Sequence, residues 1–238
     1  TDLASMAEAE VDEMLSAARL DELAARIDPA RAMPLAPGTL PAGGGTIYLT
    51  TTDPWGNAVS LLESNYQGFG SGLVDPATGI AFHDRGAFFR LDPDHPNALA
   101  PGKRPTHTLA PGMLLRDGQP WIIHGSMGGE IQPQIFAQFV SSVVDGAADV
   151  ATAVAAPRWA AMMRQQHGAP ELTALESRVH GELPGALRAM GHEVVLQDAF
   201  SSSLGHAHAI EIVRDATGAV DSYAAGYDPR SEGAAAAW

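Results

Sequence analysis

The sequence contains no cysteine, which excludes disulfide bonds, thiol catalysis and zinc sites built on thiolates. Lysine occurs once, as Lys103, and 28 acidic residues outnumber 14 basic ones. The resulting formal charge of −14 repels phosphate backbones, so no nucleic-acid partner is expected. No apolar run approaches the ~18 residues that span a bilayer, and the acidic start lacks the basic end of a signal peptide. The compartment stays open, with the cytoplasm slightly favoured.

Composition and patterning predict a globular α+β protein. Of the 238 residues, 45% are hydrophobic and 18% are charged, which suits one large core or two small ones. TIYLTTTD and AVSLLES, joined by the turn DPWGN, form a predicted β-hairpin. The other predicted elements are helices at 3–27, 131–146, 148–156 and 183–190, strands at 79–82, 108–115, 121–124, 193–197, 208–213 and 220–225, and a Pro/Gly-rich connector at 33–45. Strands precede helices without strict alternation, which favours a layered sandwich over a doubly wound sheet.

Thr46 follows three glycines and begins the first predicted strand. A threonine hydroxyl is a weak nucleophile unless a base takes its proton. If Thr46 became the first residue of a chain, its own α-amine, with a pKa of about 7.7–8.0, could be that base. The alternative is an ordinary strand threonine after a flexible loop, and spacing alone favours this alternative.

The segment HGSMGGE at 124–130 leads from a strand through two glycines into a helix. Backbone N–H groups at such a junction could bind an oxyanion, helped by the helix dipole. A plain turn that needs glycine for a positive φ explains the pattern equally well. The basic loop 97–108 could hold a substrate carboxylate, but pairing with surface acids is the favoured explanation.

Two other patterns give no cofactor site. SNYQGFGSG at 64–72 lacks the GxGxxG spacing and the following helix of a dinucleotide site. His206 and His208 lie two apart on a predicted strand and face one side, but no third ligand has suitable spacing, so no metal is expected. YDPR at 227–230 is predicted to be a tight turn with an ion pair.

A series of short motifs follows in order from Gly45 to the end of the chain. They are T-x-Y at 46–48, D-x-x-GNAVS at 53–60, FGSG at 69–72, NA-x-x-PGKRP at 97–105, GS-x-GG at 125–129, APRW at 156–159 and YDPR at 227–230. In this order and spacing the chain resembles the small subunit of the γ-glutamyltranspeptidase family, whose members are N-terminal nucleophile hydrolases. Its bacterial γ-glutamyltransferase-like branch is the most similar.

The resemblance implies an αββα four-layer sandwich and self-cleavage of the Gly45–Thr46 bond. Residues 1–45 would be the tail of a large subunit plus the processing linker, and residues 46–238 the catalytic small subunit, partnered by that large subunit. Thr46 would be the nucleophile and its new amine the general base, with no cofactor. Ser64 would supply a second hydroxyl that steadies Thr46, and Gly128 and Gly129 the oxyanion-hole N–H groups.

The substrate pocket departs from the family pattern. The aspartate that holds the α-amino group of a γ-glutamyl donor corresponds to Phe88, and the polar anchor before it to Arg85. The two serines that contact the α-carboxylate correspond to His107 and Thr108. Loss of the carboxylate predicts weak γ-glutamyl binding. A γ-glutamyl hydrolase or transferase with a rebuilt donor pocket is the first hypothesis. The alternatives are an acylase on another N-acyl substrate, such as a cephalosporin side chain, or a non-catalytic relic that acts as a binding protein.

Overall fold

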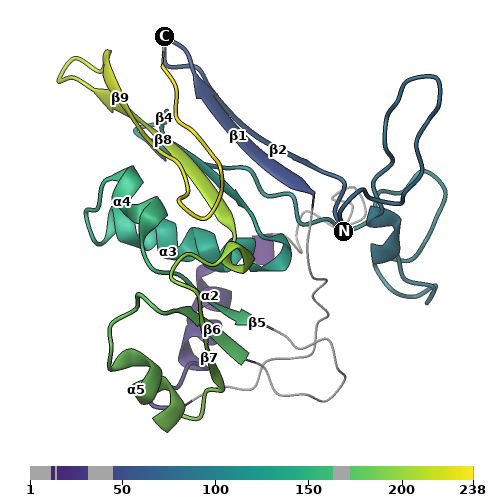
Figure 1. Cartoon of the computed structure of the whole chain (residues 1–238), viewed down its shortest axis with the longest axis horizontal. Coiled ribbons are helices and arrows are strands. Elements are labelled where there is room, and N and C mark those ends of the chain that lie inside the picture. The colour runs from purple at the N-terminus through teal and green to yellow at the C-terminus, as the bar shows by residue number, and fades with distance from the viewer. Residues whose placement is uncertain (1–11, 14, 32–44, 163–171, 238) are drawn as a thin grey trace.

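The computed structural model describes residues 12–13, 15–31, 45–162 and 172–237, and it confirms an α+β protein (Figure 1). The hairpin forms a two-stranded sheet, β1-β2. A four-stranded antiparallel sheet has the order β3-β4-β8-β9, and a three-stranded sheet the order β5-β6-β7. The elements are α2 Ala17–Ala25, β1 Thr46–Thr52, β2 Ala58–Ser64, β3 Gly112–Arg116, β4 Gln119–Met127, α3 Gln132–Val144, α4 Val150–Ala155, β5 Trp159–Met162, β6 Leu172–Glu176, α5 Leu183–Ala189, β7 Val194–Gln197, β8 His206–Arg214 and β9 Val220–Gly226.

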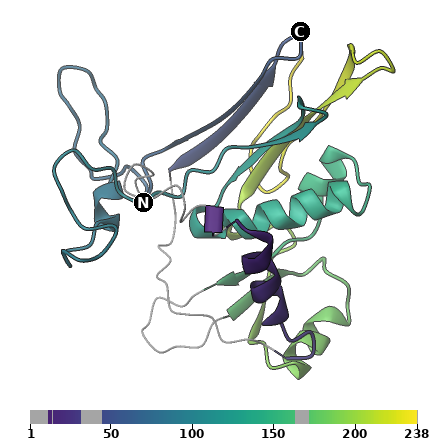
Figure 2. The same ribbon diagram turned by 180° about the vertical axis from the view of Figure 1, so that it is seen from behind.

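The hairpin and the four-stranded sheet pack face to face. Figures 1 and 2 show β1-β2 beside β4 and β8, with α3 and α4 on the opposite side of the larger sheet. Gly125 makes this close approach possible, because a Cβ there would lie 2.3 Å from the ring of Tyr48. On the helical side, Ile122 and the alanines of β8 pack against Ile135 and Phe139 in one buried cluster. The hairpin, the four-stranded sheet and the helices α3 and α4 thus form two sheet layers and one helical layer, and the β5-β6-β7 sheet adjoins α3.

The turn of the hairpin determines which residues meet at its open end. Asp53 Oδ1 accepts a hydrogen bond from the N–H of Asn57 at 2.9 Å, and Gly56 adopts a φ of 82° that disfavours other residues. The antiparallel register that follows places Thr46 opposite Ser64. A local turn therefore brings together two hydroxyl groups that are 18 positions apart.

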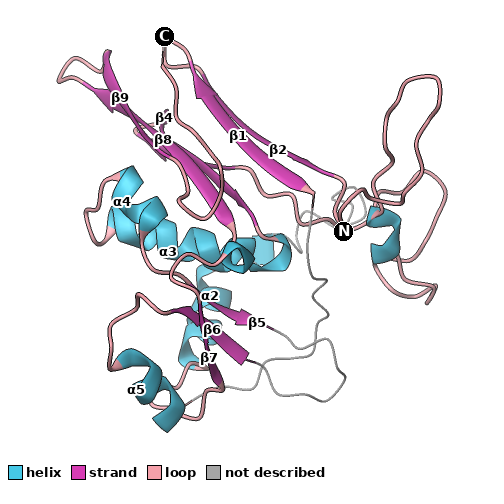
Figure 3. Ribbon diagram, viewed as in Figure 1, coloured by secondary structure: helices cyan, strands magenta, loops and turns pink. Residues whose placement is uncertain are grey.

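Several predicted elements need correction. The predicted strand 79–82 is wrong: Ala81 forms only an isolated bridge with Val74. The strand expected at 108–115 begins only at Gly112. Between β2 and β3 the chain forms turns and one 3₁₀ helix, Arg85–Phe88 (Figure 3). Of the helices expected at 3–27, the structure shows α2, while residues 1–11 lie outside the described residues. Strands β5 and β6 were not predicted.

His124 is a buried histidine within the core. The residue is 6% exposed, and its ring lies near Phe136 and Phe139, at centroid distances of 5.1 and 5.2 Å. Gly112 leaves space for it, since a Cβ there would lie 2.5 Å from the ring. Burial lowers the pKa of His124 to about 4. The ring is therefore neutral in the folded protein near pH 7.

This burial predicts a loss of stability in mild acid. The unfolded chain takes up a proton near pH 6.5 and the folded one near 4, so the free energy of unfolding should fall by roughly 3 kcal/mol across that interval. Urea unfolding at pH 7.5, 6 and 4.5 would measure it. His124→Leu should flatten this slope, whereas the exposed-site control His180→Gln should leave it unchanged. Equal slopes in the parent and His124→Leu would contradict the prediction.

A buried network of ion pairs joins the C-terminal turn to the three-stranded sheet. Asp228 contacts Arg158 at 2.6 Å and Arg230 at 3.0 Å, and Arg230 contacts Glu176 at 2.6 Å. Arg178 reaches the other oxygen of Glu176 at 2.8 Å. The ion pair predicted within YDPR is confirmed, but it is one part of a larger network.

None of the helices within the described residues is long and apolar enough to cross a membrane.

Candidate active site

A pair of hydroxyl groups lies at the open end of the hairpin. Thr46 Oγ1 and Ser64 Oγ are 2.7 Å apart. Ser64 Oγ also accepts hydrogen bonds from the N–H of Tyr66 and from Nη2 of Arg85, both at 2.9 Å. A hydroxyl oxygen has two lone pairs and one proton. Because both lone pairs are used, Ser64 donates its proton to Thr46, and a hydrogen bond in this direction would stabilise any negative charge that formed on the threonine oxygen.

The Gly45–Thr46 peptide bond is positioned by a hydrogen bond and by close packing. The Gly45 carbonyl accepts a hydrogen bond from the N–H of Asn65 at 3.2 Å. A Cβ at Gly45 would lie 2.3 Å from the carbonyl oxygen of Gly68, so no side chain fits there without movement of the backbone. The glycine at this position is therefore required by close packing.

Arg85 extends the network away from the nucleophile candidate. It begins the 3₁₀ helix and is 4% exposed. Nη1 donates to Thr108 Oγ1 at 3.3 Å and Nη2 to Ser64, whereas Nε has no hydrogen-bond partner among the described residues. Burial lowers the pKa of Arg85. The structure thus joins four of the predicted residues, Thr46, Ser64, Arg85 and Thr108, by hydrogen bonds.

Two aromatic rings form a wall beside Arg85. The rings of Tyr66 and Phe88 are 4.6 Å apart, and the guanidinium carbon lies 5.3 Å from the centre of the Tyr66 ring. Tyr66 adopts a φ of 75°, which is uncommon for a residue other than glycine. Burial, together with the charges of Glu130 and Asp84, raises the pKa of Tyr66 to about 12. The phenol is therefore protonated at neutral pH.

The glycine pair lies at the end of β4 and connects to the same region. Gly128 and Gly129 have φ values of 151° and 56°, a backbone conformation that favours glycine and is compatible with both a plain turn and an oxyanion site. A Cβ at Gly129 would meet nothing within 4 Å, which leaves open space beside its backbone. Glu130 follows, and its carboxyl group interacts with Tyr66 and Arg85, although burial raises its pKa.

His107 does not join the hydrogen-bond network. Its side chain is exposed, and Nδ1 accepts a hydrogen bond from the N–H of Leu109 at 3.2 Å. Partial burial and the nearby charge of Arg85 lower its pKa. His206 and His208 lie on one face of β8, where the His208 ring stacks on Tyr48 at 6.3 Å. The described part of the chain holds no cluster of three or more potential metal ligands among His, Cys, Asp and Glu.

The family of this chain follows from its similarity to known proteins. The family described as gamma-glutamyltranspeptidase matches residues 1–238, the whole chain. The chain belongs to the gamma-glutamyltranspeptidase family. The predicted family and its N-terminal nucleophile hydrolase fold are therefore confirmed.

Members of the gamma-glutamyltranspeptidase family with related sequences include two bacterial proenzymes. An oxamate amidohydrolase proenzyme of Klebsiella pneumoniae is 40% identical over 96% of this chain and 42% of its own length. A glutathione hydrolase-like proenzyme of Bacillus subtilis is 36% identical over 82% of this chain and 36% of its own length. The chain thus spans less than half the length of these relatives.

Two solved structures share the fold of this chain. A cephalosporin acylase from Bacillus halodurans superposes with a TM-score of 0.83 at 37% identity, covering 100% of this chain and 41% of that one. A gamma-glutamyltranspeptidase mutant from Helicobacter pylori gives 0.65 at 24% identity, covering 77% of this chain and 99% of that one.

Three groups in this gamma-glutamyltranspeptidase-family site were not predicted from the sequence. They are the N–H of Asn65, the ring of Tyr66 and the carboxyl of Glu130. Each lies next to a predicted residue: Asn65 and Tyr66 follow Ser64, and Glu130 follows Gly129. The hydrogen bond of Asn65 to Gly45, the packing of Tyr66 on Phe88 and the charge interaction of Glu130 with Arg85 depend on tertiary structure. Only the run of polar and aromatic residues after Ser64 gave a signal.

Proposed function

We propose that this protein is an amidohydrolase that first cleaves its own Gly45–Thr46 bond and then uses Thr46 as its nucleophile. The observation that carries this proposal is the Thr46–Ser64 hydroxyl pair, 2.7 Å apart, directly after the Gly45 carbonyl. The names of the two curated relatives, both proenzymes, agree with processing of this kind.

The proposed chemistry has two acyl transfers to the same oxygen. In maturation, Thr46 Oγ1 attacks the Gly45 carbonyl carbon, the C–N bond breaks, and water hydrolyses the resulting ester. The released α-amine of Thr46 then takes the hydroxyl proton when Oγ1 attacks a substrate amide. The amine leaving group receives that proton, and water releases the acid from the acyl-Thr46 ester. Gly128 and Gly129 are the proposed oxyanion donors.

The proposed subunit arrangement is a processed heterodimer. Residues 1–45 would stay with the large subunit and residues 46–238 would form the small one. Support comes from the outer face of the hairpin, where four apolar side chains remain 45–64% exposed: Ile47, Leu49, Val59 and Leu61. A further layer from the large subunit would bury this face, because exposed apolar faces of this kind are typical of interfaces.

The donor is proposed to be a small amide other than a typical γ-glutamyl compound. The ammonium group of a γ-glutamyl donor needs a carboxylate partner. At the corresponding position this chain has Phe88, whose ring packs on Tyr66. Weak turnover of γ-glutamyl anilide is therefore expected. Oxamate, the substrate named for the Klebsiella relative, and cephalosporin side-chain amides, suggested by the Bacillus halodurans structure, complete the set of donors to compare.

The proposal is tested by determining the N-terminal sequences of the purified protein. A new chain that begins at Thr46, together with amide hydrolysis by the processed enzyme, is the expected result. A protein that stays uncleaved and hydrolyses no donor would instead support the non-catalytic alternative. Robust γ-glutamyl transfer at micromolar donor would contradict the proposed role of Phe88.

Ser64→Ala is expected to slow both acyl transfers by roughly 10- to 100-fold, because the variant loses the hydrogen bond donated to Thr46 Oγ1. The appearance of the Thr46 N-terminus over time, followed by mass spectrometry, gives the rate of the first. Ser64→Thr keeps the hydroxyl and should mature at a rate close to that of the parent. Equal rates for Ser64→Ala and the parent would show that this hydroxyl has only a structural role.

A further inference from the structure

Arg85 is a buried cation for which the described residues provide no ion-pair partner. Two other buried arginines, Arg158 and Arg230, have carboxylates within 2.6 Å. Arg85 is 4% exposed, yet no carboxylate lies within ion-pair distance among the described residues. Its two described side-chain partners are neutral hydroxyls, and Nε has none. A buried charge of this kind is costly unless an anion pairs with it.

The position of Arg85 limits how far that anion can be from the scissile carbonyl. Only the Ser64 hydroxyl separates the guanidinium from Thr46: the two hydrogen bonds are 2.9 and 2.7 Å long. A carboxylate bonded directly to the scissile carbonyl carbon lies one C–C bond, about 1.5 Å, away. The α-carboxylate of a γ-glutamyl group lies four C–C bonds away. The short donor therefore matches the closeness of Arg85 to the nucleophile.

The aromatic wall favours the same class of donor. Tyr66 and Phe88 pack together beside Arg85 and supply no carboxylate for an amino group. The charges of two carboxyl groups, Asp84 and Glu130, act on Arg85, but among the described residues neither lies within ion-pair distance of it. Burial raises the pKa of Glu130, and this weakens its repulsion of an anionic substrate. The surroundings of Arg85 thus combine one cation with flat apolar surface.

We propose that the acyl donor of this enzyme is a short amide that carries a carboxylate on or one carbon from its scissile carbonyl, and that Arg85 binds this carboxylate. The inference rests on the proposed role of Thr46 as nucleophile. With oxamate, Thr46 Oγ1 bonds to the amide carbon, the C–N bond breaks and ammonia leaves. Water then cleaves the oxalyl ester, so oxamate and water give oxalate and ammonium.

The experiment compares oxamate with its neutral analogue oxamide, in the processed parent and in Arg85→Gln. The parent should hydrolyse oxamate with a kcat/KM roughly 100-fold above that for oxamide. In Arg85→Gln the kcat/KM for oxamate should fall enough to remove most of this preference, whereas the kcat/KM for oxamide should stay within about 5-fold of the parent value. Arg90→Gln changes an exposed arginine five positions further along the chain and should keep the parent's preference.

Other results have distinct meanings. An equal loss on both substrates would show that Arg85 only positions Ser64, and the proposal would fail. A parent without preference for oxamate over oxamide would overturn it even if Arg85→Gln does not mature. A protein that neither forms a Thr46 N-terminus nor hydrolyses any amide would instead remove the proposed function itself.

Discussion

Thr46→Ala is expected to leave the protein as one uncleaved chain, with amide hydrolysis reduced by at least about 10⁴-fold. The substitution removes the oxygen that would attack both the Gly45 carbonyl and the donor. The Gly45 carbonyl would still accept its hydrogen bond from Asn65, so the chain should keep its local structure. Intact mass and N-terminal sequencing measure the first effect, and ammonia release measures the second.

Two matched variants make the Thr46 result specific. Thr46→Ser retains a hydroxyl and should still be cleaved, at a lower rate. Thr51→Ala makes the same change at an exposed position of β1 and should mature normally. Cleavage between residues 45 and 46 in Thr46→Ala would disprove the assignment, because a group other than the Thr46 hydroxyl would then be the nucleophile.

Asp228→Asn is expected to lower the free energy of unfolding by about 3–5 kcal/mol. The carboxylate is 0% exposed and bonds to Arg158, Arg230 and the N–H of Ala207. Burial would raise the pKa of Asp228, but Arg158 and these N–H groups hold it below its ordinary value. Asparagine has the same shape but no charge, so Arg158 and Arg230 would lose the negative partner that Asp228 provides. Urea unfolding at neutral pH gives the difference.

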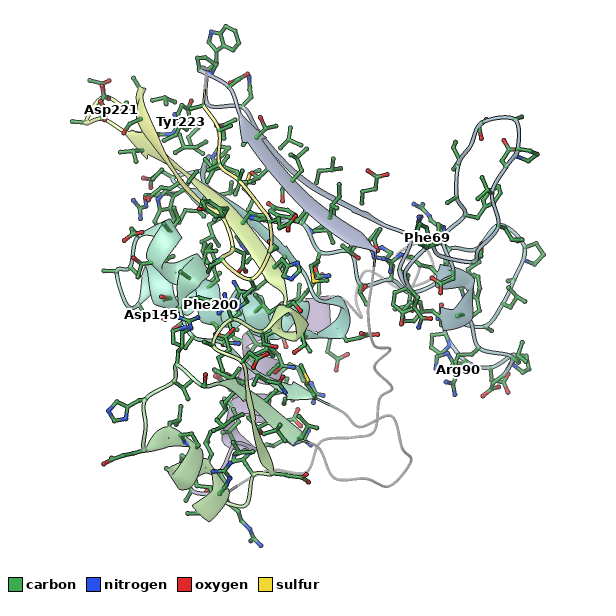
Figure 4. All side chains as sticks on the ribbon, viewed as in Figure 1. Phe69, Arg90, Asp145, Phe200, Asp221 and Tyr223 are labelled. Atoms are coloured by element: carbon green, nitrogen blue, oxygen red, sulfur yellow. The ribbon has the colours of Figure 1, made fainter. Side chains whose placement is uncertain are left out.

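The control for this variant is Asp221→Asn. Asp221 is exposed on β9, close in sequence and labelled with Tyr223 in Figure 4, and its loss should change stability by less than about 0.5 kcal/mol. Because the pKa of Asp228 is depressed in the folded state, its contribution is present above pH ~4 and is lost as the pH falls through the folded pKa. Equal stability of both variants would show that the network contributes nothing at this position.

The sequence predicted best those elements whose pattern is local. The hairpin was predicted because β1 is rich in β-branched residues and a strong turn leads from it into β2, and α3 because its apolar residues recur at helical spacing. The segment 79–82 looked like a strand but lies in a region of turns, where it forms a single bridge. β5 consists of only four residues, WAAM, with no alternation that could mark it.

The residues of the candidate site that lie within sequence motifs could be predicted. Thr46, Ser64, Arg85 and Thr108 were predicted from motif positions, and the structure joins them through hydrogen bonds. Their catalytic and binding roles stay predictions. The partners of the YDPR turn could not be predicted, because Glu176 is more than 50 positions from Arg230. Nothing in the local sequence of β6 indicates that its last residue faces a buried cation.

The tight fit of Gly45 against Gly68 has a consequence for how such an enzyme could change substrate. If Thr46 cleaves the bond before it, the first acyl group that each molecule processes is its own glycine, which has no side chain. In maturation the acyl group would then have no side chain to contact the wall formed by Tyr66 and Phe88. Mutations of this aromatic wall that alter donor choice could therefore accumulate in a lineage while every new protein still activates itself.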